Sequence, residues 1–203
     1  MFMRTGYFYI ILIVLLMVLL SGCNNAKRLP EDKLLLNKNE IEISNPEISK
    51  SEINRFIKQK PNKKLIGFFR FHLTVYFIGE RIKKDNKIKK WLTESVGEKP
   101  VVLDTSMANN TTRQIEYYLR NKGYFNSNVK KTIDTPLVKK ANVTYKIQAN
   151  RPYRIRNVEY QVEDSTLKPA IEASMEKSLL RQGEIYSVED FKNERERITS
   201  FLK

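Results

Sequence analysis

Apolar residues recur along this chain with two different periods, and together these periods predict a mixed α+β fold. The clearest period of two covers residues 142–149, where four apolar residues alternate with polar ones: Val143, Tyr145, Ile147 and Ala149. Such alternation predicts a strand with one packed face and one wet face. Looser alternation predicts three further strands, at 34–43, 124–133 and 158–162. We expect Pro136 to prevent the strand predicted at 124–133 from continuing.

Helical periods fill the intervals between the predicted strands. Ser49 with Glu52 three residues later is typical of a helix start, and Asn109–Thr112 provides caps for a second helix that ends at Gly123. In the last quarter of the chain, one helix is predicted to begin near Pro169 and another after Ser187. The apolar stretch 65–78 fits strand or helix equally well, and we expect it to be buried.

The predicted elements occur twice in the same order. The first unit, 34–150, reads strand, helix, helix, strand, strand, with an aromatic and basic insert at 61–100. The second, 151–203, begins at Arg151-Pro152 with strand, helix, helix and lacks its last two strands. Ile115–Arg120 also aligns with Ile198–Lys203, which supports a repeat. We therefore expect the given chain to be a truncated piece of a longer protein.

The N-terminal pattern resembles the lipobox of bacterial lipoproteins. An apolar run at 7–20 follows Arg4, is too short to span a bilayer comfortably, and leads into Ser21-Gly22-Cys23. The resemblance implies cleavage between Gly22 and Cys23, with a covalent lipid on Cys23. Residues 1–22 are then a signal peptide and 23–33 a polar tether. The alternative is an ordinary membrane anchor with an incidental cysteine.

Charge narrows the class of partner. The chain has a net charge of +14, and its cations cluster, most densely at 81–90. For an exported protein the expected anionic partners are lipid headgroups, lipopolysaccharide or acidic client segments, and not nucleic acid. A lysine-rich but merely solvated surface is the alternative interpretation of these clusters.

Few residues of this chain are candidates for a catalytic role. Cys23 is the only cysteine and His72 the only histidine, and His72 lies among aromatic residues, where packing is the better interpretation. We find no zinc-ligand spacing and no phosphate-binding glycine loop. We therefore predict no enzyme activity, no metal and no cofactor other than the lipid on Cys23.

The repeat resembles the polypeptide-transport-associated (POTRA) domains of outer-membrane barrel-assembly proteins. The residues that carry the resemblance are a helix-to-strand corner and the opening of the second unit: Ile115, Tyr118, Leu119, Gly123, Tyr124, Phe125 and Arg151–Ile155. Together with the lipobox and Gly97–Val101, the chain looks like the N-terminal part of a TamA-like or BamA-like protein of the lipidated type found in Bacteroidetes. The resemblance implies tandem β-α-α-β-β units, a C-terminal barrel in the full-length protein, and outer-membrane localisation facing the periplasm.

The resemblance also implies a binding site. It places the strand near 124–133 at the edge of the sheet, where an incoming peptide could add a strand. The candidate residues are Tyr124, Phe125, Val129, Lys130, Lys131 and Thr132. The partners implied are outer-membrane protein clients and periplasmic helper proteins. Two alternatives stay open: Lys130 and Lys131 protect the edge against pairing, or the protein is a cell-envelope lipoprotein that binds an anionic polymer or lipid headgroups through its lysines.

Overall fold

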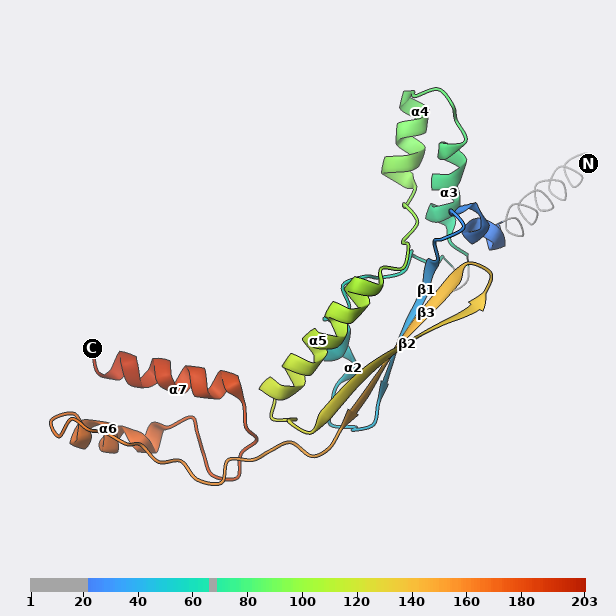
Figure 1. Cartoon of the computed structure of the whole chain (residues 1–203). Coiled ribbons are helices and arrows are strands. Elements are labelled where there is room, and N and C mark those ends of the chain that lie inside the picture. The colour runs from blue at the N-terminus through green and yellow to red at the C-terminus, as the bar shows by residue number, and fades with distance from the viewer. Residues whose placement is uncertain (1–21, 66–68) are drawn as a thin grey trace, which may run out of the picture. The chain divides into compact units, whose positions relative to one another are not determined.

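The computed structural model describes residues 22–65 and 69–203, with the side chains of 22–24 left out (Figure 1). The predicted signal segment up to Ser21 and the side chain of Cys23 therefore lie outside the described residues. The chain divides into two compact units. One comprises Met1–Glu40, Ile57–Ala108 and Thr132–Thr144, and the other Ile41–Phe56, Asn109–Lys131 and Tyr145–Lys203. The predicted domain bounds, 34–150 and 151–203, stay predictions.

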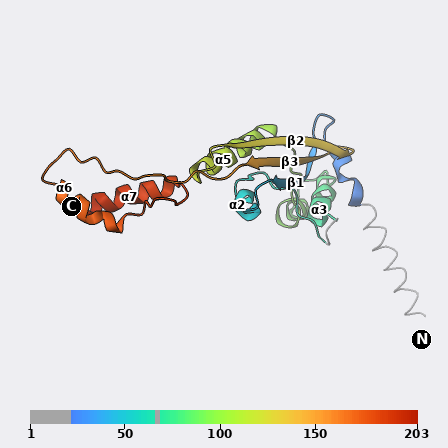
Figure 2. The same cartoon turned by 90° about the horizontal axis from the view of Figure 1, so that it is seen from below.

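A three-stranded mixed sheet confirms the predicted α+β class. Its strands are β1 (Leu35–Ile43), β2 (Ser127–Leu137) and β3 (Lys140–Ala149), in the order β1-β3-β2. Figure 2 shows β3 between the other two. β1 runs parallel to β3, because Leu35 N donates to Lys139 O and Ser44 N to Ile147 O. β2 and β3 form an antiparallel hairpin, closed by a turn in which Lys139 has a φ of 56°.

The register of the hairpin follows from two cross-strand hydrogen bonds. Asn142 Nδ2 donates to Asp134 Oδ2 at 3.3 Å, and Asn150 N donates to Asn126 O at 3.5 Å. Both pairs have the same sum of residue numbers, so they belong to one antiparallel register. Lys139 O and Ile147 O accept from the β1 side, so odd-numbered residues of β3 face β1 and even-numbered ones face β2.

Alternation along β3 confirms the clearest strand prediction. Val143, Tyr145, Ile147 and Ala149 are all buried, while Lys146 and Gln148 are exposed. β3 is the central strand, so its covered face needs apolar side chains along its whole length. In the second unit, Ile115 and Leu119 of helix α5 (Thr105–Asn121) are fully buried. Figure 1 shows α5 running alongside the sheet.

α5 begins four residues before the predicted caps. Asp104 precedes the helix, and its Oδ1 accepts from Ser106 N at 2.8 Å and Met107 N at 3.1 Å. These bonds hold the pKa of the Asp104 carboxyl below its usual value. The carboxylate satisfies N–H groups that have no partner within the helix, so the helix starts there. Thr111, predicted as a cap, is buried instead.

Residues 71–96, which contain the second half of the apolar stretch and the basic residues after it, form a helical hairpin within the first unit. α3 (Phe71–Glu80) is followed by α4 (Lys87–Lys90) and a π-helical continuation, η2 (Trp91–Val96). The two arms are close: a Cβ on Gly79 would lie 2.7 Å from Thr93 Cγ2. His72 lies at the base, where its Nδ1 is 2.8 Å from Val96 O. Its contacts are those of a packing residue.

Residues 23–33 do not behave as the predicted tether. The 3₁₀ helix η1 (Gly22–Arg28) packs against α3, with Asn25 Nδ2 donating to Thr74 Oγ1 at 2.8 Å. Ala26 and Leu29 join Leu35 and Leu73 in the core of the first unit. The prediction was wrong because the segment contains two apolar residues, spaced three apart, that complete this core.

Helices dominate the last quarter of the chain. α6 (Lys168–Ser174), the 3₁₀ turn η3 (Met175–Lys177) and α7 (Val188–Phe201) follow an irregular segment. The strand predicted at 158–162 is wrong, since 155–164 forms neither strand nor helix. The described chain offers this segment no neighbouring strand, and the one isolated β-bridge described in this region joins Arg154 to Ile185. Another short helix, α2 (Lys50–Asn54), precedes these in the sequence and buries Ile53.

The start of α7 confirms its prediction. Ser187 Oγ accepts from Asp190 N at 3.4 Å, and the rings of Tyr186 and Phe191 lie 5.1 Å apart between centroids. Ser187 thus caps the helix that was predicted after it, and the ring contact is a hydrophobic staple across the helix start.

Candidate functional site: the outer edge of β2

β2 is the edge strand whose outer side carries no backbone partner in the described chain. β3 lies on its inner side only. The other edge strand, β1, is partly paired, because Leu36 N donates to Val101 O and Leu103 N donates to Leu34 O, both at 2.8 Å. Within residues 22–65 and 69–203, no backbone hydrogen bond from outside the sheet reaches Ser127–Leu137. A free edge of this kind is a template for strand addition.

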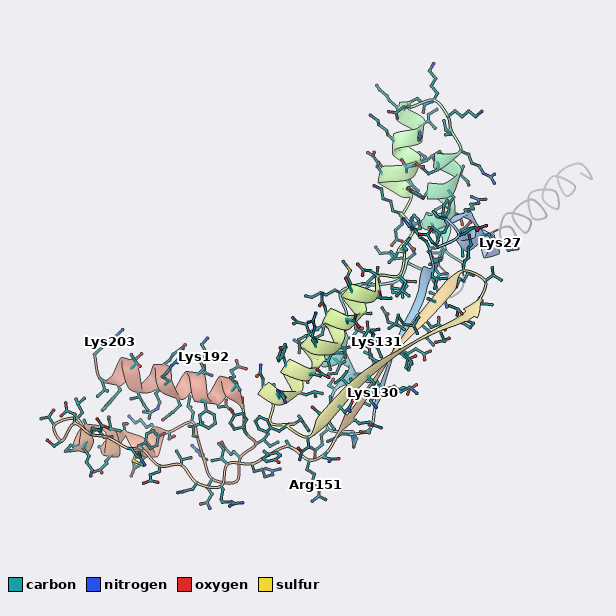
Figure 3. The ribbon with its side chains drawn as sticks, in the orientation of Figure 1. Lys27, Lys130, Lys131, Arg151, Lys192 and Lys203 are labelled. Atoms are coloured by element: carbon teal, nitrogen blue, oxygen red, sulfur yellow. The ribbon has the colours of Figure 1, made fainter. Side chains whose placement is uncertain are left out.

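The register shows which residues present the free groups. Even-numbered residues of β2, such as Lys130 and Thr132, face β3 and take part in the ladder. Odd-numbered residues therefore direct their N–H and C=O outward. Of the predicted site residues, Val129 and Lys131 belong to this outward set, and Ile133 joins them. Lys130 and Lys131 are labelled on β2 in Figure 3.

Side chains alternate across the same strand. Val129 is 4% exposed and points to the face that α5 covers, and Lys131 is half-buried on that face. Lys130 and Thr132 are exposed on the opposite face. The strand therefore offers backbone groups at its edge, with a polar face on one side and a helix on the other.

Tyr124 and Phe125 lie outside β2, which begins three residues later than predicted. Gly123 has a φ of 82°, and Tyr124 N donates to Leu119 O at 2.9 Å, so the chain leaves α5 through a left-handed helix end. Tyr153 N donates to Gly123 O at 2.8 Å. Phe125 packs against Tyr153 and Tyr186, with ring centroids 5.3 and 5.1 Å away. These residues join α5 to the segment after Arg151 and are not part of the free edge.

Pro136 does not end the strand, contrary to the prediction. β2 continues to Leu137, and the register places Pro136 opposite Lys140, directly beside the turn. A proline there removes a single ladder donor at the end of the hairpin, where the chain is about to reverse in any case. The free edge upstream of it is unaffected.

Two adjoining shallow hollows, which share Arg113 and Glu116, form a groove between side chains of β2 and the polar face of α5. Its walls come from both elements: Asn109, Thr112, Arg113, Glu116, Tyr117, Arg120, Ser127 and Lys131. Arg113 donates to Asn110 Oδ1, which orients its guanidinium along the helix. Tyr117 is 62% exposed. Three cations and one acid give the groove a positive balance, so it favours an acidic or aromatic extended segment.

Sequence reasoning missed the helical half of this groove. Arg113, Glu116, Tyr117 and Arg120 follow the spacing i, i+3, i+4, i+7, which places them on one face of a helix. This periodicity in the sequence could have identified these four residues as the exposed face of the helix. Their position beside β2, however, depends on the corner at Gly123.

A second cavity, in the same unit, lies at the C-terminal end of α5. It has a volume of about 170 Å³ and is lined by residues from four segments: Glu47, Ile48, Glu52, Tyr118, Lys122, Tyr124 and Ile185. Tyr118 Oη donates to Glu52 Oε2 at 2.6 Å, and burial together with this carboxylate raises the pKa of the Tyr118 hydroxyl. Burial, followed by the Glu47 carboxylate, likewise raises the pKa of Tyr124. The carboxylates are thus occupied by tyrosine hydroxyls within the fold.

Metal ligands do not cluster in the described part of the chain. No group of three His, Cys, Asp or Glu residues there could hold a metal ion. None of the described helices combines the length and apolar character needed to cross a bilayer. The predicted lipid site, Cys23, lies outside the described side chains.

The described chain thus contains a small three-stranded sheet with helices, and one of its edge strands is uncovered. Residues 73–150, from α3 to the end of β3, match the POTRA family, described as "Surface antigen variable number repeat". This match covers less than half of the chain and supports the POTRA part of the predicted resemblance.

Solved structures of the same class resemble the chain at low identity. The POTRA1-2 region of the periplasmic domain of Omp85 from Anabaena is 14% identical, with 84% of this chain and 79% of that chain covered and a TM-score of 0.34. POTRA3-5 of BamA from Haemophilus influenzae is 14% identical, with 85% and 88% covered and a TM-score of 0.32. A search of curated protein sequences finds no match.

Proposed function

We propose that this chain is a non-enzymatic, lipid-anchored module that binds extended segments of outer-membrane β-barrel proteins, or of periplasmic helper proteins, by strand addition to β2. The observation that carries the proposal is the outer edge of β2, which no described backbone segment covers. The POTRA match supports it, because the matched segment contains both walls of the groove.

Main-chain pairing suits a receptor for many clients. Val129, Lys131 and Ile133 each present one N–H and one C=O, about six hydrogen-bonding groups in all. These groups do not read side chains, so any extended segment without proline can pair with them. The positive groove beside them adds a preference for acidic or aromatic side chains.

The expected affinity is weak. Six backbone hydrogen bonds contribute about 1 kcal/mol each in water, and ordering the incoming segment opposes them by a similar total. Stable binding therefore needs the side-chain contacts of the groove as well. Weak binding suits a module that receives a segment and then passes it on.

The proposed lipid anchor determines where in the cell the module acts. A lipid on Cys23 would hold the chain on the outer membrane, with the POTRA segment facing the periplasm, where unfolded clients pass. We also propose that the full-length protein continues into the second unit and a C-terminal barrel, as in TamA-like and BamA-like proteins. This part of the proposal rests on the lipobox-like sequence and the resemblance.

The register allows a sharp test of strand addition. Lys131→Pro removes an outward N–H and leaves the β2–β3 ladder intact, whereas Lys130→Pro removes a ladder donor. Lys131→Gln is the matched control, because it removes the charge and keeps the N–H. The probe is a fluorescent peptide of alternating aromatic and polar residues, about the length of one barrel strand (9–11 residues), and binding is followed by anisotropy.

We expect Lys131→Pro to abolish peptide binding with an unchanged circular dichroism spectrum, and Lys131→Gln to bind within about threefold of the unmodified chain. Lys130→Pro should instead lower the stability of the hairpin. Unchanged binding by a folded Lys131→Pro variant would refute strand addition at this edge. Should the remaining binding also vanish in high salt, the alternative of an anionic-polymer-binding lipoprotein would be favoured.

A further inference from the structure

We propose that the far end of the hairpin α3–α4–η2 is a membrane-surface contact, in which Ile88 and Trp91 enter an anionic phospholipid bilayer among surrounding lysines. This contact lies outside the proposed strand-addition site and does not depend on it. It would give the lipid-anchored chain a second hold on the membrane surface.

Two large apolar side chains are exposed on the second arm of the hairpin. Ile88 is 62% exposed and Trp91 is 57% exposed. They are three residues apart on a continuous helical stretch, so they lie on one face. The opposite face of this helical stretch packs against α3, since Thr93 is buried beside Gly79. Tryptophan has an apolar ring with one polar group, and it is enriched at membrane–water interfaces.

Cations surround this apolar pair. Residues 81–90 contain six Lys or Arg side chains and one acid, Asp85. Lys84, Lys87 and Lys90 are exposed. None of the ion pairs found among the described residues involves a cation of this segment. A helix with exposed apolar residues between unpaired lysines has the composition of an interfacial, membrane-bound helix.

The hairpin is packed against the segment that follows the predicted lipid site. Cys23 belongs to the helix η1, which contacts the first turns of α3. Arg28 lies over the ring of Phe77, with its Cζ 5.5 Å from the ring centroid. Because α3 has ten residues, it is about 15 Å long. A lipid on Cys23 would therefore hold the far end of the hairpin within reach of the same membrane surface.

The combination of exposed apolar residues and lysines favours a bilayer surface over a soluble polymer as the binding partner. A soluble anionic polymer would engage the lysines and leave Ile88 and Trp91 in water. A bilayer surface with anionic headgroups engages both, because lysine stems extend along the apolar layer while their ammonium groups reach the phosphates. The two occupants therefore predict different environments for Trp91.

Trp91 is the only tryptophan of the chain, so its fluorescence reports this contact directly. The full chain, as the cell produces it, is reconstituted into vesicles of phosphatidylcholine alone or with phosphatidylglycerol, each with brominated acyl chains as quenchers. We expect a blue shift and quenching of Trp91 only in the vesicles that contain phosphatidylglycerol. Raising the salt to about 0.5 M should reverse both changes, because it shortens the screening length.

Charge reversal distinguishes the patch from the general charge of the protein. The triple variant Lys84→Glu, Lys87→Glu, Lys90→Glu should lose the quenching, since each lysine near an anionic surface contributes about fivefold in binding. The matched control reverses three exposed lysines elsewhere: Lys168, Lys177 and Lys203. It should retain the quenching of the unmodified chain.

Three results would overturn the proposal. The first is equal Trp91 emission in the neutral and anionic vesicles. The second is equal loss of quenching in the two triple variants. The third is a blue shift with soluble dextran sulfate as large as that with the anionic vesicles, which would favour a polymer. None of these results bears on peptide binding at β2, so the two proposals fail separately.

Discussion

Glu194 of α7 is a buried carboxylate whose loss should open the C-terminal helices. Its side chain is only 3% exposed and accepts four hydrogen bonds. Tyr160 Oη donates at 2.6 Å, Leu179 N at 2.9 Å, and Arg197 donates twice, at 2.7 and 2.9 Å. The bidentate bond from Arg197 is the main reason that the pKa of Glu194 falls to about 2.

The pKa shift of Glu194 determines how much its ionised carboxylate stabilises the fold. A carboxyl pKa that moves from near 4.5 in the unfolded chain to about 2 in the folded one is equivalent to about 3 kcal/mol at neutral pH. Because the folded pKa is the lower one, this stabilisation is fully present above pH 4.5. It is lost as the pH falls from about 4.5 to about 2.

The substitution Glu194→Gln removes this stabilisation and directs an amide NH₂ at one of the donors. We expect the free energy of unfolding of 155–203 to fall by about 3 kcal/mol at pH 7. Hydrogen–deuterium exchange of peptides from this segment measures the local opening, and urea unfolding followed by circular dichroism measures the whole chain. At pH 2 the variant and the unmodified chain should be almost equally stable.

A control on the same helix separates the buried carboxylate from surface charge. Glu196 is exposed, with an ion pair to Lys192 at 3.8 Å, so Glu196→Gln should change the stability by less than about 0.5 kcal/mol. Equal effects of the two substitutions would refute the reasoning. So would a difference between Glu194→Gln and the unmodified chain that stays constant from pH 7 to pH 2.

Two glycine substitutions test the close approaches seen in the fold. Gly123→Ala should lower the free energy of unfolding in urea more than Gly183→Ala does. Both glycines have a left-handed φ, which costs a residue with a Cβ about 1–2 kcal/mol. Only at Gly123, however, would the new Cβ also meet a backbone atom, Tyr186 O at 2.8 Å. Equal losses would contradict this. Gly79→Ala should destabilise the helical hairpin, although alanine favours helix, because the new Cβ would lie 2.7 Å from Thr93 Cγ2. A red shift of the Trp91 fluorescence emission, or easier quenching of it, would report the opening of the hairpin.

Alternation identified which segments could be strands but not which would find a partner. Val143, Tyr145 and Ile147 lie on β3, between two other strands, and their alternation was confirmed. Residues 158–162 show the same alternation and remain irregular. There Tyr160 instead donates its hydroxyl hydrogen to Glu194, and its pKa is raised by burial and by that carboxylate. A partner strand is a property of the whole sheet, so a local pattern cannot supply it.

The repeated helix shows a similar limit. Leu119 of α5 is fully buried, while Leu202, which aligns with it, is 40% exposed, and Phe201 is 52% exposed. The two sequences share their apolar spacing, but burial depends on a sheet for the helix to cover. The edge position of β2 was predictable from hairpin connectivity and the resemblance. The start of β2 was not, because the ring contacts of Phe125 with Tyr153 and Tyr186 involve residues far along the chain.

The parallel pairing of β1 with β3 sets the order in which this protein can fold. Asn37 on β1 donates to Asn142 on β3, a partner 105 residues later in the chain. When β1 leaves the ribosome, its partner has not yet been synthesised, and contacts between such distant residues form slowly. The first strand to be made must therefore wait for the last strand of the sheet. The sheet can therefore be completed only after the chain has been synthesised up to the end of β3, at Ala149.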